Sequence, residues 1–185
     1  MLTETKLKGV YIYEPKVFGD NRGWFMESYS ERVFKEAGLD IRFVQDNHSY
    51  SAQKGVLRGL HFQKAPMAQS KLLRVLRGTL MDVVVDIRKG SPTFGQYVAV
   101  ELSADNKKQI FMPKGMAHGF VTLTDDVEVH YKVDEFYAPE TEGGIIYNDP
   151  DLAIDWGTDK FILSDKDKKH PTLKECTANF VYGEI

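Results

Sequence analysis

The chain has 185 residues, and its 24 Lys and Arg residues nearly balance 27 Asp and Glu residues, giving a formal net charge of −3. This length is typical of one domain, and the charge argues against nucleic acid or an anionic membrane as a partner. The single cysteine excludes an internal disulfide and fits a reducing compartment. No apolar run approaches the roughly 20 residues of a membrane-spanning helix, and the N-terminus lacks the apolar core of a signal peptide. We therefore predict one domain over residues 1–185 in a cytoplasmic protein.

The predicted elements are mainly short β-strands, rich in β-branched and aromatic residues and separated by turn residues. One short helix is predicted after Ser30, which can cap it, and before Gly38, which can end it. Many short strands favour an all-β, mainly antiparallel sandwich or barrel, and no glycine-rich phosphate loop precedes a helix. In chain order, the predicted strands cover residues 7–13, 24–29, 41–45, 56–62, 72–76, 79–87, 97–102, 109–112, 119–124 and 127–137.

Two of the five histidines have unusual neighbours. His61 ends a run that contains Arg58 and Gly59. Ideal alternation would place Arg58 and His61 on opposite faces of a strand, but Gly59 permits a bulge that could turn both into one pocket. His118 follows a Pro-Gly turn at the start of a strand. The other three are expected to be ordinary residues of a loop, a strand and a tail: His48, His130 and His170.

The spacing Gly-x5-His…Pro-x-Gly-x2-His, which ends at His61 and His118, resembles the two motifs of the cupin superfamily. The resemblance implies a jelly-roll barrel, also described as a double-stranded β-helix, with a few short peripheral helices. Metal-binding cupins have His-x-His followed by Glu, whereas here Gln63 replaces the second His and the Glu is missing. A first-row metal normally needs three or four protein ligands, so we predict no metal. Histidines without a metal suit proton transfer near neutral pH.

Several side chains suit an anionic substrate and acid–base chemistry. Arg22, Arg58, Lys71 and Arg74 can bind phosphate oxygens, although each also fits a solvated strand edge. Tyr131 can donate a proton or simply pack, and Asp167 can orient an imidazole.

Six segments together resemble one family, that of dTDP-4-dehydrorhamnose 3,5-epimerases. The resemblance runs in the same order over nearly the whole chain. The segments are 18–29, 43–49, 55–63, 86–95, 113–120 and 163–167, and they include Arg-Gly-Leu-His ending at His61 and Leu-Ser-x-Lys-Asp ending at Asp167.

This resemblance implies epimerisation at C3 and C5 of dTDP-4-dehydro-6-deoxy-D-glucose, giving dTDP-4-dehydro-L-rhamnose for dTDP-L-rhamnose biosynthesis. The 4-keto group makes the hydrogens on both carbons acidic, so a base, an acid and donors to the enolate oxygen suffice without a cofactor. The resemblance also implies a homodimer.

The resemblance further assigns roles to individual residues. His61 is the base, Asp167 its partner and Tyr131 the acid. Lys71 and His118 contact the sugar, Arg58 lies near the diphosphate, and Tyr137 stacks on the thymine. Further substrate-binding positions, some of them contributed by a partner subunit, are Arg22, Glu27, Gln45, Asn47, Glu142 and Lys166.

Three alternatives remain open. The first is an epimerase acting at C3 or C5 alone, or a ketoisomerase of another deoxysugar. The second is a non-catalytic jelly-roll module that binds sugar nucleotides. The third is a metal-dependent cupin, which Gln63 and the missing Glu disfavour.

Overall fold

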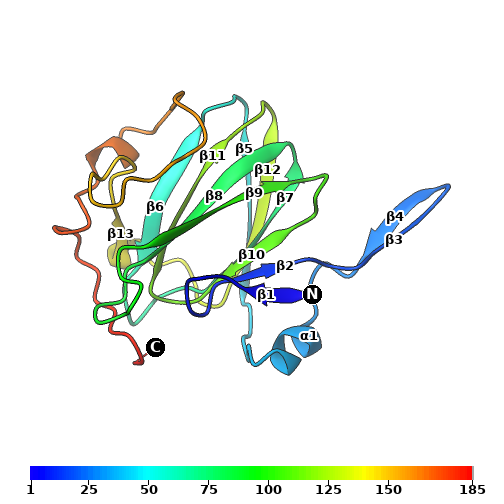
Figure 1. The fold of residues 1–185 in the computed structure, drawn as a ribbon, viewed down its shortest axis with the longest axis horizontal. Helices are drawn as coiled ribbons and strands as arrows, with labels where there is room; N and C mark the ends of the chain where they lie inside the picture. Colours follow the sequence, from blue (N-terminus) through cyan, green and yellow to red (C-terminus); the bar gives the residue numbers. More distant parts are fainter. Residues whose placement is uncertain (185) are drawn as a thin grey trace.

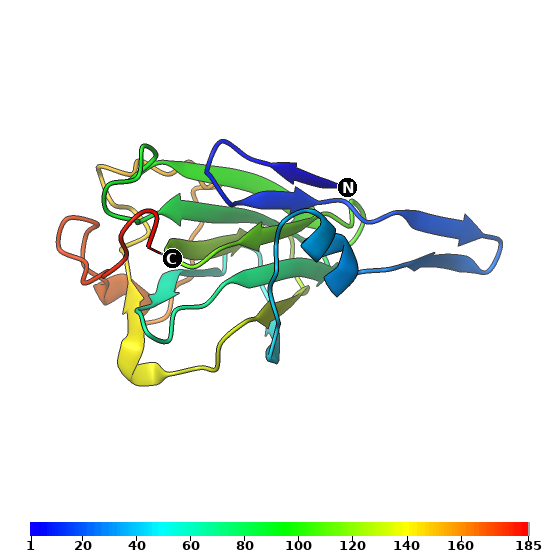
Figure 2. The same ribbon diagram turned by 90° about the horizontal axis from the view of Figure 1, so that it is seen from below.

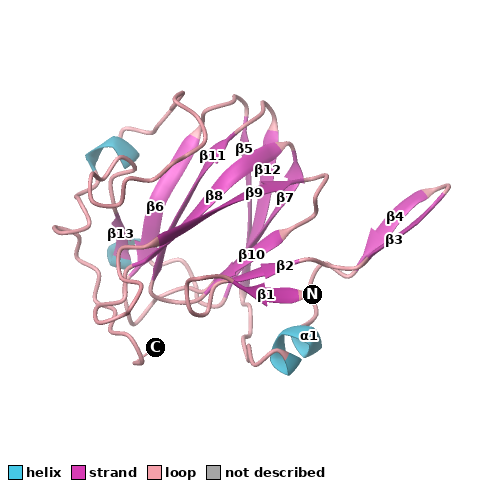
Figure 3. Cartoon of the chain, viewed as in Figure 1, coloured by secondary structure: helices cyan, strands magenta, loops and turns pink. Residues whose placement is uncertain are grey.

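The structure, a computed structural model, describes residues 1–184, which form two facing antiparallel sheets and a separate hairpin (Figures 1 and 3). The first sheet has the strand order β1-β2-β10-β7-β12-β5, and the second has the order β13-β6-β11-β8-β9. The first sheet contains β1 (Leu2–Glu4), β2 (Tyr11–Tyr13), β10 (Gln109–Met112), β7 (Lys71–Arg77), β12 (Val127–Val133) and β5 (Gln45–Ser51). The second contains β13 (Glu142–Gly144), β6 (Leu57–Gln63), β11 (Met116–Thr122), β8 (Thr79–Asp86) and β9 (Tyr97–Ser103). The predicted mainly antiparallel sandwich or barrel is confirmed.

Strand β8 shows why the core is extensive for a chain of this size. Its residues alternate between two hydrophobic clusters, so that Leu80 and Val84 face the space between the sheets. Val83 and Val85 face the opposite side, where they pack against the segment that follows β13. Burial on both faces explains the nearly continuous apolar sequence of this strand.

The predicted helix is confirmed as α1 (Glu31–Glu36). Ser30 occupies the N-cap position, but its side chain makes no capping hydrogen bond. Gly38 has φ +84°, and its N–H donates to Lys35 O over 3.0 Å, as expected of a glycine that ends a helix. Buried Phe34 packs edge-on against Tyr13 and anchors the helix beside the first sheet.

Several strand boundaries differ from the prediction. The segment 41–44 is not a strand, because Ile41 and Phe43 pack against the cluster around Phe34 instead of joining a ladder. Strand β5 begins at Gln45 and has a polar sequence. It includes His48, which was expected to lie in a loop. Short strands β1 and β13 were not predicted, since each has only three residues.

The hairpin of β3 (Val17–Asp20) and β4 (Gly23–Met26) projects from the body of the molecule (Figures 1 and 2). Neither strand pairs with the two main sheets. The side chains of Phe18, Trp24 and Phe25 are all more than half exposed. Exposed aromatic groups concentrated on one element are typical of a contact surface.

The remaining elements are two short 3₁₀ helices, η1 (Pro139–Thr141) and η2 (Asp167–Lys169). Within residues 1–184, no helix has the length and apolar character required to cross a membrane.

Candidate active site

A cleft with two adjoining lobes is lined by strands of both sheets, β5, β7 and β12 from the first and β6 and β11 from the second. The lobes have volumes of about 260 and 290 Å³, and they share His61, Lys71 and Tyr131 as lining residues. The first lobe is also lined by Gln45, Asn47, Tyr137 and Glu142, and the second by Arg58, His118, Lys166 and Asp167. The cleft therefore brings together eleven of the thirteen residues to which the family resemblance assigned roles. Arg74, the other candidate for an anionic substrate, lies outside it and lines a separate concavity beside Trp24.

His61 and Asp167 form a close pair, although 106 positions separate them in the chain. Nε2 of His61 lies 2.6 Å from Oδ1 of Asp167, and the Asp167 N–H donates to Oγ of Ser164. Burial raises the pKa of Asp167, but hydrogen bonds and charge from His61, together with Ser164, outweigh it and lower the pKa overall. A charged Asp167 fixes the proton of His61 on Nε2, which leaves Nδ1 as the nitrogen that can accept one.

The pocket also contains Arg58, as predicted from the glycine between it and His61. The ladder between β6 and β11 shifts register between His118 and Phe120, opposite Gly59. Gly59 has φ +126°, and a Cβ there would lie 2.5 Å from the Cα of Gly119. Only glycine tolerates this backbone and this approach, so the irregularity that turns Arg58 and His61 into one lobe depends on it.

His118 lies directly across the ladder from His61 and belongs to a second histidine–aspartate pair. Its Nε2 is 2.8 Å from Oδ2 of Asp82, and both residues are buried. Within residues 1–184, Oδ1 of Asp82 has no hydrogen-bond partner. His118 is therefore held rigidly, with its other ring nitrogen available to the cleft.

Lys71 and Tyr131 complete the part of the cleft that both lobes share. The Lys71 ammonium lies 5.9 Å from the centre of the Tyr131 ring. Burial lowers the pKa of Lys71 to about 8, although the charges of Asp82 and Glu142 oppose this shift. Burial also raises the pKa of Tyr131, against an opposing effect of Arg58, so the phenol keeps its proton at neutral pH. The cleft thus combines a base, a protonated phenol and a cation.

The outer part of the first lobe carries a polar network. Gln45 donates to Oδ1 of Asn47 over 2.9 Å. Oε2 of Glu142 accepts hydrogen bonds from the Tyr137 hydroxyl, at 3.1 Å, and from Lys166, at 2.6 Å. Tyr137 is 57% exposed, so one face of its ring is available to a planar ligand.

Gln63 has a structural role. Its amide nitrogen donates to the carbonyls of Met67 and Phe136, and its oxygen accepts from the Ala138 N–H. These bonds hold the amide group against three main-chain groups on the segments around Met67 and Phe136. The described residues contain one group with closely spaced ligand atoms, His61, Asp167 and His170. We do not assign it as a metal site, because Nε2 of His61 and Oδ1 of Asp167 already bond to each other.

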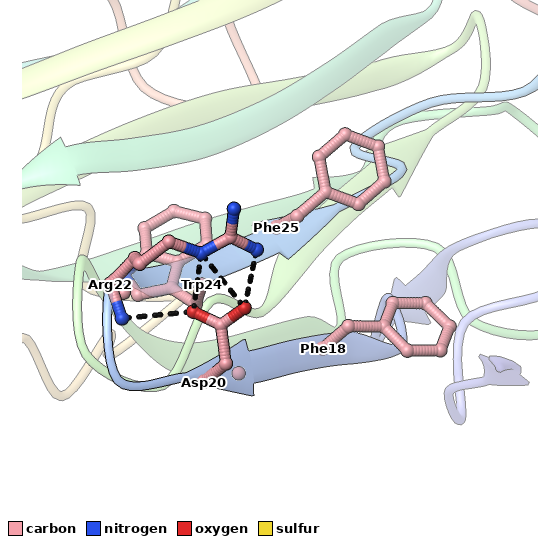
Figure 4. A pocket seen from close by; sticks show the side chains of 7 residues that line it. Phe18, Asp20, Arg22, Trp24 and Phe25 are labelled. Carbon is pink, nitrogen blue, oxygen red and sulfur yellow. Dashed lines mark hydrogen bonds and ion pairs between the residues drawn. The ribbon is translucent and has the colours of Figure 1, made fainter.

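Arg22 and Glu27 do not line the cleft of their own chain. Arg22 lies in the turn of the β3–β4 hairpin, where it pairs with Asp20 beside a concavity lined by hairpin residues (Figure 4). Glu27 follows β4, and its carbonyl accepts from the Tyr13 hydroxyl.

Sequence reasoning missed two residues at the site. Asp82 was not singled out, yet a carboxylate within an otherwise apolar strand sequence normally has a partner, and this was the available signal. His170 was placed in an ordinary tail, but its ring lies edge-on to that of His61, with centroids 5.4 Å apart. No local pattern in the sequence indicates that contact.

Comparisons with known proteins agree with this geometry. The family described as dTDP-4-dehydrorhamnose 3,5-epimerase matches residues 4–175. A protein of that name from Shigella flexneri is 54% identical over 165 residues, which cover 89% of this chain and 91% of the relative.

Two solved structures are also similar. The dTDP-6-deoxy-D-glucose-3,5-epimerase of Legionella pneumophila, in complex with dTDP-4-keto-L-rhamnose, is 48% identical, with a TM-score of 0.90 and coverage of 95% of this chain and 93% of that one. ChmJ, a 3'-monoepimerase from Streptomyces bikiniensis in complex with dTDP-quinovose, is 37% identical, with a TM-score of 0.87 and coverage of 92% and 86%. The barrel is the cupin-like fold of these proteins. Because the family match spans most of the chain and identity to its members reaches about one half, the chain belongs to the dTDP-4-dehydrorhamnose 3,5-epimerase family.

Proposed function

We propose that His61, Asp167 and Tyr131 carry out the 3,5-epimerisation of dTDP-4-dehydro-6-deoxy-D-glucose to dTDP-4-dehydro-L-rhamnose. As a member of its family the chain is an isomerase of nucleotide sugars in dTDP-rhamnose biosynthesis. The observation that supports the assignment of roles is the His61–Asp167 pair, which shares one cleft with Tyr131 and Lys71.

Proton removal is assigned to His61. Its Nδ1 takes a proton from C3 or C5 of the sugar, and the electrons of the broken C–H bond move to the C4 carbonyl oxygen to form an enolate. The carboxylate of Asp167 stabilises the imidazolium that results, because Oδ1 already accepts from Nε2.

The enolate oxygen needs a positive charge or strong donors beside it. Lys71 is suited to this role, because its ammonium is desolvated in the cleft and its pKa of about 8 leaves it charged at neutral pH. His118, fixed by Asp82, supplies a second contact to the sugar.

Tyr131 is the proposed acid. Its phenol gives a proton to the carbon from the face opposite His61, which inverts that carbon. Exchange with solvent then restores the proton of Tyr131 and removes the proton held by His61. Burial raises the pKa of Tyr131, so the phenol stays protonated until it transfers its proton to the carbon of the enolate.

The nucleotide is assigned to the polar side chains around both lobes. Arg58 approaches the diphosphate, and the exposed ring of Tyr137 stacks on the thymine. Further contacts are assigned to Gln45, Asn47, Glu142 and Lys166, which line the lobes.

A homodimer explains the hairpin of β3 and β4. Its exposed Phe18, Trp24 and Phe25 need an apolar surface, and the hairpin contacts neither main sheet of its own chain as a strand partner. We propose that it lies against a second copy, so that Arg22 and Glu27 reach the nucleotide in the partner's cleft. One domain over residues 1–185 and a cytoplasmic location remain predictions.

Epimerisation at one carbon is the main alternative, because the 3'-monoepimerase from Streptomyces bikiniensis has the same fold. Tyr131 supports inversion in either case, so the number of carbons that exchange distinguishes the two reactions. A non-catalytic sugar-nucleotide module would not need the His61–Asp167 pair.

The test is to incubate the chain with dTDP-4-dehydro-6-deoxyglucose in deuterated water and to locate deuterium by NMR. We expect deuterium at C3 and C5 and an L-rhamno product. Deuterium at one carbon alone would establish the alternative, and tight binding without exchange would establish a binding module. His61→Asn is expected to abolish exchange at both carbons, whereas Tyr131→Phe should retain exchange and lose inversion. Full inversion by the Tyr131→Phe variant would refute the assigned acid.

A further inference from the structure

The third member of the cluster at the cleft is His170, which follows η2 and precedes Pro171. Nε2 of His170 lies 3.4 Å from Oδ1 of Asp167, the same oxygen that is bonded to His61. This nitrogen is buried, and within residues 1–184 it has no hydrogen-bond partner. A buried donor normally has a partner, and Oδ1 of Asp167 is the acceptor at hand.

The packing around His170 fixes the position of its ring beside His61 and Asp167. Gly144, which pairs with His61 across β13 and β6, lies under the ring so closely that a Cβ at position 144 would overlap it. The planes of the His61 and His170 rings meet at 77°. The Pro171 carbonyl accepts a hydrogen bond of 2.8 Å from the Ile146 N–H, which ties the segment to the chain beyond β13.

We propose that His170 is a positioning residue of the catalytic pair: its neutral imidazole donates a proton from Nε2 to Asp167 and holds the carboxylate and the His61 ring in line. This inference rests on the role proposed above for His61 and Asp167. The titratable groups that face His170 are His61 from β6, and Asp167 and Lys166 at the start of η2. Burial lowers the pKa of His170, and Asp167 opposes this effect without cancelling it, so the ring is neutral at pH 7.5.

Neutrality matters for the proposed role. A charged His170 would compete with the His61 imidazolium for the carboxylate at the moment when the imidazolium forms. A neutral N–H donor instead restrains Asp167 without cancelling its charge, so that Asp167 still stabilises the protonated base. Removing the donor should leave the carboxylate free to rotate away from Nε2 of His61.

The first experiment records long-range ¹H–¹⁵N spectra of the imidazoles in the full chain at pH 7.5, without substrate. We expect the tautomer of His170 that carries its proton on Nε2. A proton on Nδ1 with a bare Nε2 would overturn the proposal. Because no substrate is present, this result is independent of whether the chain epimerises a sugar.

The second experiment compares His170→Phe with His170→Gln in the deuterium-exchange assay. Phe keeps a ring but lacks a donor, whereas the amide nitrogen of Gln lies at the same point along the side chain as Nε2. We expect Phe to lower kcat by about tenfold, as for the loss of one hydrogen bond to a charged group, with KM unchanged. Gln should restore most of the loss.

His48→Phe, on exposed β5, is the matched control and should retain wild-type kcat. Wild-type kcat in His170→Phe would overturn the proposal, as would a Gln variant that is folded like wild type yet as slow as Phe. If His170→Phe does not fold, the tautomer of the wild-type chain decides alone. Absence of exchange in the wild-type chain would instead refute the proposed function.

Discussion

The cleft holds two histidine–aspartate pairs that have the same chemical groups in different settings. His61 and Asp167 lie 2.6 Å apart, with exposed side-chain fractions of 31% and 6%. His118 and Asp82 lie 2.8 Å apart, with fractions of only 9% and 0%. Asp82 stands on β8, directly beside the strand of His118, whereas Asp167 comes from η2 near the end of the chain.

The difference in exposure suits the two pairs to different roles. A base must accept a proton, hand it on and recover, so it needs a ring that reaches both substrate and solvent. The exposure of the His61 ring meets that need, and in the proposed mechanism Asp167 stabilises its charged form. The second pair is locked inside one sheet and suits a group that holds its place beside the sugar. Variants of the His61–Asp167 pair should therefore lower kcat, whereas variants of the His118–Asp82 pair should change the pKa of the neighbouring Lys71.

The largest effect is expected from Asp167→Asn. The amide can donate to Nε2 of His61 and reverse its tautomer, which would put a proton on the nitrogen that should act as base. By analogy with other catalytic His–Asp pairs, kcat should fall by roughly 10³- to 10⁴-fold. Initial rates of deuterium uptake measure the loss, and circular dichroism should show a melting temperature near that of wild type. A loss below tenfold would remove Asp167 from the catalytic pair.

Lys71→Met tests how much stability the protein loses by burying a cation near the two histidine–aspartate pairs. The pKa of Lys71 falls from 10.5 to about 8 on burial, so the folded chain disfavours the ammonium. This penalty is fully present below pH 8 and disappears as the pH rises toward 10.5. The variant should gain about 1 to 3 kcal/mol of unfolding free energy at pH 7, and less near pH 10, while losing activity. Urea titrations at both pH values measure the gain, with Lys108→Met on the surface as the control; a loss of stability at pH 7 would contradict the prediction.

Asp82→Asn should alter the pH range of activity more than the maximal rate. The charge of Asp82 raises the pKa of Lys71 against the effect of burial, so its removal lowers that pKa further below 10.5 than in wild type. Because the role proposed for Lys71 requires its positive charge, activity should disappear at a lower pH than in wild type. At pH 8 the variant should be about fivefold slower if its Lys71 pKa is about one unit lower, because the charged fraction of Lys71 falls from about one half to about one tenth. A pH–rate profile with an unchanged basic limb would show that the two groups do not interact.

Ser164→Ala is expected to have the smallest effect. Oγ of Ser164 accepts from the Asp167 N–H over 3.1 Å and helps to keep the pKa of Asp167 low. Its loss should reduce kcat a few-fold and stability by about 1 kcal/mol. Ser164→Thr retains the hydroxyl and should restore both, as measured by exchange rates and thermal unfolding. A defect as large as that of Asp167→Asn would mean that the aspartate depends on this one bond.

The sequence was sufficient to predict the parts of the site that lie within single motifs. Arg58 and His61 were predicted to share a pocket because Gly59 stands between them, and the register shift at that point agrees. His61 and His118 were paired through motif spacing, and the ladder places them opposite each other.

Contacts between distant segments were harder to foresee. Strand β5 was misplaced because its polar residues carry no apolar alternation, although every second residue is at least partly buried. The contact of His170 with Asp167 depends on how the chain after β13 folds back onto β6. Neither the hydrophobic periodicity nor the turn residues of this segment predict that course of the chain. The position of the β3–β4 hairpin is equally hard to predict, because the pairing of its two strands does not specify what its exposed aromatic side chains contact.

The close approach of Gly59 to Gly119 also sets limits on redesign. A Cβ at position 119 would lie 2.9 Å from the Arg58 carbonyl, just as one at 59 would strike Gly119, so neither position admits a larger residue alone. The distance between the imidazoles of His61 and His118 is consequently fixed by the close packing of the two backbones. Engineering that aims to admit a bulkier sugar should therefore leave Gly59 and Gly119 unchanged and alter other side chains that line the cleft.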